Sequence, residues 1–158
     1  MINFREKHPI RTCDKKYSTY RRYKPYLVKD FNHRCGYTDS PDFWFGGPRT
    51  FHIDHFMPSS KYPELETEYE NLIYACSYVN ILKSDEDGEK YLDPCKEDLN
   101  NHFYRDKSGK IFPNDNSPKA QYMYEQLKLY LSRYSIIWTL ERIRECMCKL
   151  YEVRKSLT

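Results

Sequence analysis

The chain has 158 residues and a net charge of +3, with 39% apolar and 31% charged residues. This length and balance are typical of one globular domain, alone or with an appendage. No apolar run approaches the roughly 18 residues that a membrane-spanning helix needs, and the first residues lack the apolar stretch of a secretory signal. We therefore expect a cytoplasmic protein that makes no contact with a membrane.

Residues 1–34 are predicted to form a basic arm that ends in a helix near Tyr20 to His33. The arm holds ten Lys or Arg and three acidic residues, a net charge of +7 that leaves the remainder at −4. Residues 15–24 interleave Lys and Arg with tyrosines. This pattern suits nucleic-acid binding, because cations reach phosphates and rings stack on bases. A helix whose tyrosines face the protein's own core gives the same pattern. The predicted nucleic-acid contacts here are Lys15, Lys16, Arg21, Arg22 and Lys24.

Residues 35–116 are predicted to form the core of the protein, beginning with a turn-rich stretch over 35–50. Within the core, residues 51–84 read as strand, loop, strand and helix. Residues 85–117 are rich in Asp, Asn, Gly and Pro, which is typical of a long loop region. The segment 107–110 lies between two short apolar runs and predicts a hairpin turn.

Residues 117–158 are predicted to form a helical appendage, which makes the whole chain an α+β protein. Ser117-Pro118 is a favourable helix start, with a side-chain cap and a proline at the first helical position. A break at Ser132-Arg133 separates this helix from a second one over about 135–155. Apolar residues recur along one face of the second helix, at Ile136, Leu140, Ile143, Met147 and Leu150.

The polar residues of 51–84 resemble those of the HNH nuclease family, which is built on a ββα-metal finger. An Asp-His pair alone is usually a structural or surface feature, so the resemblance rests on a complete ordered set. That set is Asp54, His55, Pro58, Asn71, Asn80 and Lys83. The resemblance implies an HNH endonuclease that cuts a nucleic-acid phosphodiester with one divalent cation, Mg²⁺ or Mn²⁺.

The resemblance assigns a role to each position of the set. Asp54 and Asn80 match the metal-ligand positions, and His55 matches the general base. Asn71 matches the residue that braces the loop and orients the histidine. Many members carry histidine where this chain has Asn80, but the HNH domain of RNA-guided CRISPR nucleases has asparagine there.

The chemistry of the residues agrees with these roles. Histidine is suited to taking a proton from water near neutral pH. Oxygen ligands suit a hard divalent cation, and two protein ligands at the surface of a cleft leave room for water and phosphate. Lys83 follows Asn80 by one helical turn and is either a phosphate contact or an ordinary solvated lysine. His52, two residues before Asp54, is either a supporting group of the site or a strand-end histidine.

Many members of the family also hold a structural zinc through two pairs of cysteines. The corresponding positions here are Cys35 with Thr38 and Cys76 with Val79, so each pair has lost one cysteine. Because a tetrahedral zinc site needs four ligands, we expect no structural zinc and packing by tyrosines such as Tyr37 in its place. Disulfides are not expected in a cytosolic chain.

A weaker likeness extends beyond the finger, through motifs between Leu92 and Ile111. It is to HNH proteins of anti-phage systems, among them the nuclease subunits paired with an ATPase in Septu-type and retron-linked systems. We therefore expect DNA as the substrate, without excluding RNA, and an ATPase or sensor as a partner protein. Two alternatives stay open: a subunit that is inactive until its partner releases it, and a DNA-binding scaffold whose finger has decayed.

Overall fold

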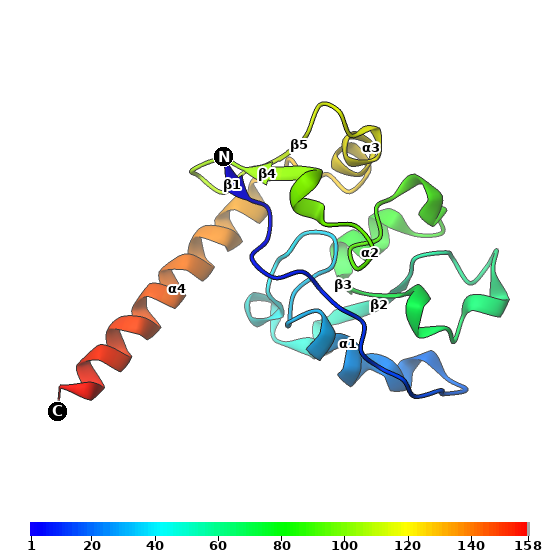
Figure 1. Ribbon diagram of the computed structural model, residues 1–158, viewed down its shortest axis with the longest axis horizontal. Helices are drawn as coiled ribbons and strands as arrows, with labels where there is room; N and C mark the ends of the chain where they lie inside the picture. Colours follow the sequence, from blue (N-terminus) through cyan, green and yellow to red (C-terminus); the bar gives the residue numbers. More distant parts are fainter. Residues whose placement is uncertain (158) are drawn as a thin grey trace.

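The computed structural model describes residues 1–157 and mixes helices with short strands (Figure 1). A two-stranded sheet and a three-stranded sheet share the body of the molecule. The elements in chain order are β1 (Ile2–Asn3), α1 (Lys24–Asp30), β2 (Phe51–His55), β3 (Leu72–Cys76), α2 (Ser77–Lys83), β4 (Phe103–Arg105), β5 (Ile111–Pro113), α3 (Pro118–Gln126) and α4 (Ser132–Ser156).

The predicted order of strand, loop, strand and helix over residues 51–84 is present. Strands β2 and β3 pair antiparallel, with Phe51 opposite Cys76 and Asp54 opposite Ile73, and α2 follows β3 directly. All five residues of β3 are buried, as expected for a continuous apolar run. The hairpin therefore packs its β3 strand into the core and leaves parts of β2 accessible.

Residues 1–34 do not stand apart as an arm. Strand β1 pairs with β4, and β4 pairs with β5 across the predicted hairpin turn. Phe4 and Arg5 are buried beside this sheet, while Tyr23, Leu27 and Phe31 belong to the main core. The high charge of the segment concealed these interleaved core residues, which join it to the body.

The C-terminal residues form the two predicted helices. Pro118 begins α3 as expected, but the Ser117 hydroxyl pairs with the His102 ring at 2.7 Å and provides no cap. Helix α4 starts at Ser132 and projects away from the body (Figure 1). None of the helices in residues 1–157 combines the length and apolar character needed to cross a membrane.

Candidate active site

A cavity of about 210 Å³ opens at the end of β2 and brings together four of the residues that the sequence singles out, Asp54, His55, Pro58 and Asn80. Asp54 and His55 reach it from β2, and Asn80 reaches it from α2. The antiparallel hairpin brings the end of β2 beside the start of β3, and α2 continues from the other end of β3 to cover β2. This arrangement places an acid, an imidazole and an amide around one small volume.

The imidazole of His55 is held from two sides. Its Nε2 lies 3.0 Å from the carbonyl oxygen of Glu66, and its ring meets the ring of Tyr20 edge-on at 4.7 Å. A carbonyl oxygen can only accept a hydrogen bond, so Nε2 donates and carries the proton. The free lone pair of the neutral ring is then on Nδ1, and that nitrogen is the one able to act as a base.

Asn71 fixes the connection between β2 and β3. Its amide oxygen accepts from the Met57 backbone N–H at 2.8 Å, and its amide nitrogen donates to the carbonyls of Met57 and Leu65. The side chain is 6% exposed. The Asn71 side chain therefore holds the loop that carries the Glu66 carbonyl, and its hydrogen bonds go to Met57 and Leu65 rather than to the imidazole.

Asp54 is buried rather than displayed at the surface of a cleft, which corrects the expectation from the sequence. Only 4% of the residue is exposed. Its Oδ2 accepts from the Tyr37 hydroxyl at 2.6 Å and lies 3.2 Å from the Lys83 ammonium. Burial raises the pKa of the Asp54 carboxyl, and the Lys83 charge and the Tyr37 hydrogen bond oppose that rise.

Lys83 cannot contact a phosphate in this arrangement, because its side chain is fully buried. Besides the Asp54 carboxylate, its ammonium donates to the backbone carbonyls of His55 at 3.0 Å, Phe56 at 3.2 Å and Glu86 at 3.5 Å. The prediction of Lys83 as a nucleic-acid contact is therefore wrong. The residue instead joins the end of β2 to the segment that follows α2.

Asn80 and His52 meet at the outer edge of the hairpin. The Asn80 amide nitrogen lies 3.4 Å from His52 Nδ1 and donates to it, which leaves the Asn80 amide oxygen free to face a ligand. His52 is exposed and lines a separate cavity of about 280 Å³ with Tyr20, Arg21 and Lys24. His52 thus contacts a residue of the site but does not line the Asp54 cavity.

The donor set of the cavity fits a hard divalent cation held by few protein ligands. A carboxylate has about four acceptor sites, and the contacts of Asp54 with Tyr37 and Lys83 leave Oδ1 the less occupied oxygen. The Asn80 amide oxygen would be the second ligand. With two protein ligands, most of the shell would be water and substrate, which Mg²⁺ accepts.

The basic residues predicted to contact nucleic acid differ in their exposure to solvent. Lys15, Lys16, Arg21 and Arg22 are exposed, although Lys16 also pairs with Glu68 at 2.9 Å. Lys24 is half-buried and donates to the carbonyl oxygen of Phe51, and burial lowers its pKa. Lys24 therefore ties α1 to β2, while the four exposed side chains are available to solvent.

Three contributors to the site escaped prediction. Tyr37 and Tyr20 lie far from the motif in the sequence, so nothing local marks them as partners of Asp54 and His55. Asp85 lines the cavity and is exposed. The signal that could have identified Asp85 is its acidic side chain just past the end of α2, five positions after Asn80.

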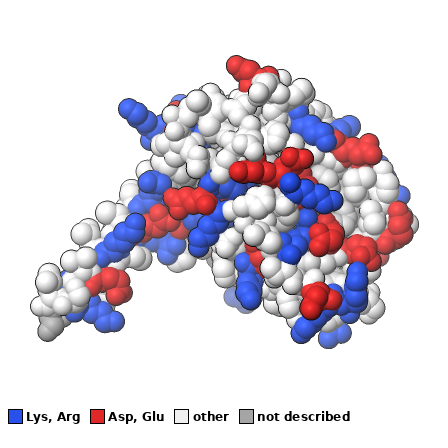
Figure 2. Space-filling model, viewed as in Figure 1, with Lys and Arg blue, Asp and Glu red and all other residues white. Residues whose placement is uncertain are grey.

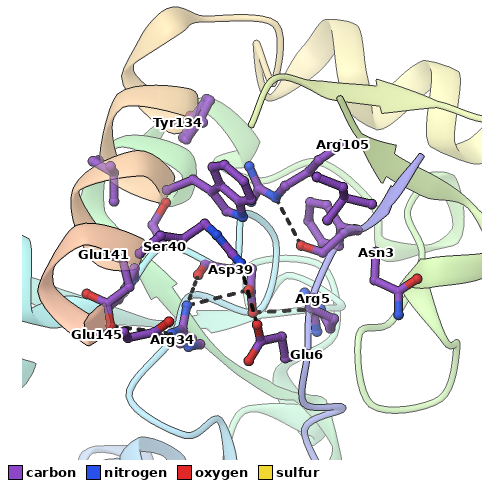
Figure 3. Close-up of a pocket in the computed structure, with 16 residues that line it drawn as sticks. Asn3, Arg5, Glu6, Arg34, Asp39, Ser40, Arg105, Tyr134, Glu141 and Glu145 are labelled. Atoms are coloured by element: carbon purple, nitrogen blue, oxygen red, sulfur yellow. Dashed lines mark hydrogen bonds and ion pairs between the residues drawn. The ribbon is translucent and has the colours of Figure 1, made fainter. Parts of the chain in front are cut away.

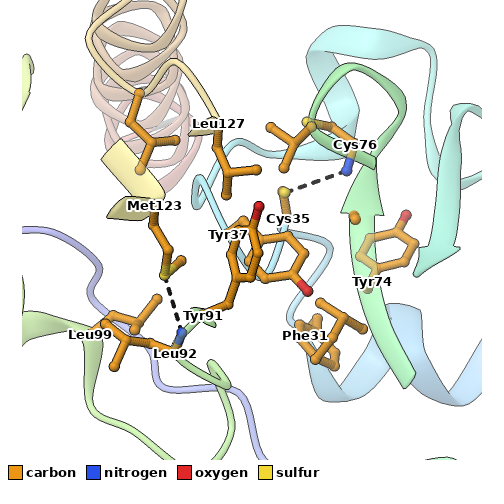
Figure 4. Close-up of a cluster of buried hydrophobic side chains, with 14 of the residues drawn as sticks. Phe31, Cys35, Tyr37, Tyr74, Cys76, Tyr91, Leu92, Leu99, Met123 and Leu127 are labelled. Carbon is orange, nitrogen blue, oxygen red and sulfur yellow. Dashed lines mark hydrogen bonds between the residues drawn. The ribbon is translucent and has the colours of Figure 1, made fainter. Parts of the chain in front are cut away.

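The region of the missing zinc cysteines is closed by packing (Figure 4). Cys35 and Cys76 are both buried, and the Cys76 backbone N–H donates to Cys35 Sγ at 3.4 Å. Burial favours the neutral thiol, but hydrogen bonds from Cys76 and Thr38 outweigh it and lower the pKa of Cys35 to about 6. The absence of a structural zinc stays a prediction, which elemental analysis of the purified protein tests.

No protein-family model matches the chain, and no curated protein matches it. The chemistry of the cavity therefore has to be inferred from its side chains. These are an imidazole with a defined basic nitrogen, a buried carboxylate and an amide oxygen, all within one volume of about 210 Å³. Together they provide a base beside a place for a hard cation.

Proposed function

We propose that this cavity is the catalytic centre of a metal-dependent phosphodiesterase. More particularly, we propose an HNH endonuclease that hydrolyses DNA, with β2, β3 and α2 as its ββα-metal finger. The observation that carries the proposal is the bond from His55 Nε2 to the Glu66 carbonyl. It leaves Nδ1 as the one basic ring nitrogen of His55, a residue that lines the cavity together with Asp54 and Asn80.

In the proposed mechanism His55 Nδ1 takes a proton from the attacking water, while the Glu66 carbonyl stabilises the imidazolium that forms. Asp54 and Asn80 would hold the divalent cation through one oxygen each. When bound there, Mg²⁺ or Mn²⁺ supplies positive charge to the phosphate and the leaving oxygen. The exposed Arg21 and the His52 edge provide donors for neighbouring phosphates of the strand.

The substrate class rests on the phosphodiester chemistry and on the exposed basic side chains before α1. Acidic and basic residues are interspersed over the face seen in Figure 2, so the protein offers no broad basic field on that face. A contact limited to a few phosphates is expected to weaken steeply as salt rises. DNA is the proposed substrate, and RNA carries the same scissile bond and serves as the comparison.

A second candidate is a nuclease subunit that is inactive until an ATPase or sensor partner releases it, as in a cytoplasmic anti-phage system. The buried pair of Asp54 and Lys83 favours it. The Lys83 ammonium occupies the carboxylate that a cation would use, at 3.2 Å. A partner that shifts the segment after α2 would draw Lys83 away from Asp54 and open the ligand.

Incubation of the purified protein with supercoiled plasmid and magnesium separates the candidates. Nicking by the protein alone, abolished by a chelator and by His55→Ala, supports the stand-alone enzyme. Cutting that needs a partner protein supports the released subunit. Binding of DNA without cutting, with and without partners and with Mn²⁺ in place of Mg²⁺, identifies a scaffold and refutes the proposal.

A further inference from the structure

Helix α4 has an anchored base and an exposed tip. At the base Tyr134 is buried, and the Trp44 ring nitrogen donates to the Glu141 carboxylate at 2.8 Å. Arg34 joins Asp39 to Glu141 beneath the helix (Figure 3). Every residue from Cys146 to Leu157 is exposed. The base is therefore part of the body, while the tip extends into solvent.

The exposed face of α4 carries a regular apolar stripe. Its spacing alternates between four and three residues, which is the pattern of two α-helices that pack side by side. The side chains are 39% to 64% exposed, so the body covers none of them fully. The stripe consists of Ile136, Leu140, Ile143, Met147 and Leu150.

Further apolar side chains widen the stripe, and Figure 2 shows uncharged side chains between the charged ones along the projection. Tyr151 and Val153 are 64% and 56% exposed, and Leu157 is 82% exposed. With the stripe they present on the order of 1,000 Å² of apolar surface, whereas the largest patch on a typical monomer is about 300–600 Å². An exposed apolar surface of this size is typical of a site that binds a partner.

The part of α4 from Leu140 to Glu152 also borders an open apolar groove of about 540 Å³. One wall is the short 3₁₀ turn Asp42–Phe45, which contributes Phe43 and Trp44, and the other is α4 itself. Phe43 is 56% exposed, so the groove is unfilled in the single chain. One chain thus carries both an unfilled apolar groove beside the middle of α4 and further exposed apolar side chains along the same helix.

We propose that α4 pairs antiparallel with α4 of a second copy of this chain. Leu140 then lies beside Leu150 of the other copy, and Ile143 lies beside Met147. Each helix then covers the groove that borders the other. The contact is self-complementary and closes with two-fold symmetry.

The dimensions of the helix and its surface agree with this pairing. From Leu140 to Leu157 the helix rises about 25 Å, enough to carry the tip of one helix past the groove of the other. Two copies burying this surface would cover on the order of 2,000 Å² in total, within the range of stable dimers. The proposal is independent of the nuclease chemistry, since no residue of the cavity takes part.

Sedimentation of the full chain over a range of concentrations tests the proposal. The wild-type protein is expected to sediment as a dimer, and Met147→Glu is expected to weaken the dimer at least about 100-fold, because each dimer then buries two carboxylates, each against the apolar Ile143 of the other copy. Lys149→Glu, on the opposite face of the helix, is the matched control and should keep the dimer. Circular dichroism should show equal helix content in all three proteins.

Cross-linking through Cys146 tests the orientation. In the antiparallel pair Cys146 lies near the two-fold axis, so Cys148→Ser protein is expected to cross-link between two Cys146 thiols. A wild-type chain that stays monomeric up to about 100 µM overturns the proposal, even if it binds another protein or anionic vesicles. A dimer that survives Met147→Glu, or that does not cross-link through Cys146, overturns it as well.

Discussion

The hairpin with α2 and the tip of α4 differ in whether their side chains are covered by other residues of the same chain. Around the hairpin, the buried polar groups of Asp54, Lys83 and Asn71 all find partners within the chain. Along the tip of α4, apolar side chains such as Met147 and Leu150 are 64% exposed. The first region is complete in one chain, and the second is not.

The comparison indicates which substitutions should alter catalysis or stability and which should alter association. A buried ion pair is costly to break because the remaining charge is left without a partner in a medium of low polarity. An exposed apolar side chain contributes little to the folding of the chain that carries it. Substitutions around the cavity should therefore alter catalysis or stability, while those at the tip should alter association alone.

The largest effect is expected for His55→Ala. Loss of the general base should lower the rate of plasmid nicking by roughly 10²–10⁴-fold. The His55 side chain is only partly buried, so circular dichroism and thermal melting should stay close to wild type. Near-normal nicking by this variant would remove His55 from the mechanism and make His52 the base to test.

Removal of Lys83 should have the next largest effect, on stability rather than on rate. Lys83→Met leaves the Asp54 carboxylate buried without its cation, which is expected to lower the free energy of unfolding by about 3–5 kcal/mol. Urea unfolding monitored by tryptophan fluorescence measures it. Lys119→Met, on the exposed start of α3, is the control and should change little.

The pairing of Lys83 with Asp54 is then checked by a double variant. Asp54→Asn combined with Lys83→Met removes both charges, so it should unfold at a higher urea concentration than Lys83→Met alone. Equal loss in the single and double variants would show that Lys83 stabilises the fold through its backbone contacts and not through Asp54.

Asn80→Ala should weaken magnesium-dependent cleavage while leaving catalysis possible. An amide oxygen contributes a dipole and no charge, so higher magnesium should restore much of the rate. We expect at least about a tenfold rise in the magnesium concentration needed for half-maximal nicking, a size of effect that even indirect partners of metal ligands produce. Unchanged dependence on magnesium would place the cation elsewhere.

The smallest effect is expected for Leu150→Ala. At a concentration low enough to keep the chain monomeric, its free energy of unfolding should stay within about 0.5 kcal/mol of wild type, because Leu150 is 64% exposed. Thermal melts at several concentrations give the measurement. A loss of several kcal/mol in the dilute monomer would mean that the tip packs on its own body.

Much of the local structure was predictable from residue patterns. Apolar periodicity and turn residues predicted several elements where the structure has them. These are the strands around His55 and Ala75, the hairpin before Ile111 and the helix that starts at Pro118. Such signals are local, because they depend on neighbours a few positions away. The resemblance to the HNH family implied that Asp54, His55 and Asn80 share one site, and the three residues do line one cavity.

The remainder depended on contacts between distant segments. The burial of Lys83 requires the carbonyls of His55 and Phe56 to converge on one ammonium, and no local pattern reports that. The Tyr37 hydroxyl reaches Asp54 from 17 positions away. The same limit applies to α4, because an apolar stripe indicates a face that seeks a partner without indicating which surface supplies it.

Gly88 shows how the packing around Lys83 constrains evolutionary change at a position outside the motif. A β-carbon at Gly88 would lie 2.5 Å from the carbonyl oxygen of Phe56, and that carbonyl accepts one hydrogen bond from Lys83. Any larger residue would have to displace this acceptor. Diverging lineages of this protein should thus vary freely at the exposed Glu89 and Lys90 but retain glycine at 88.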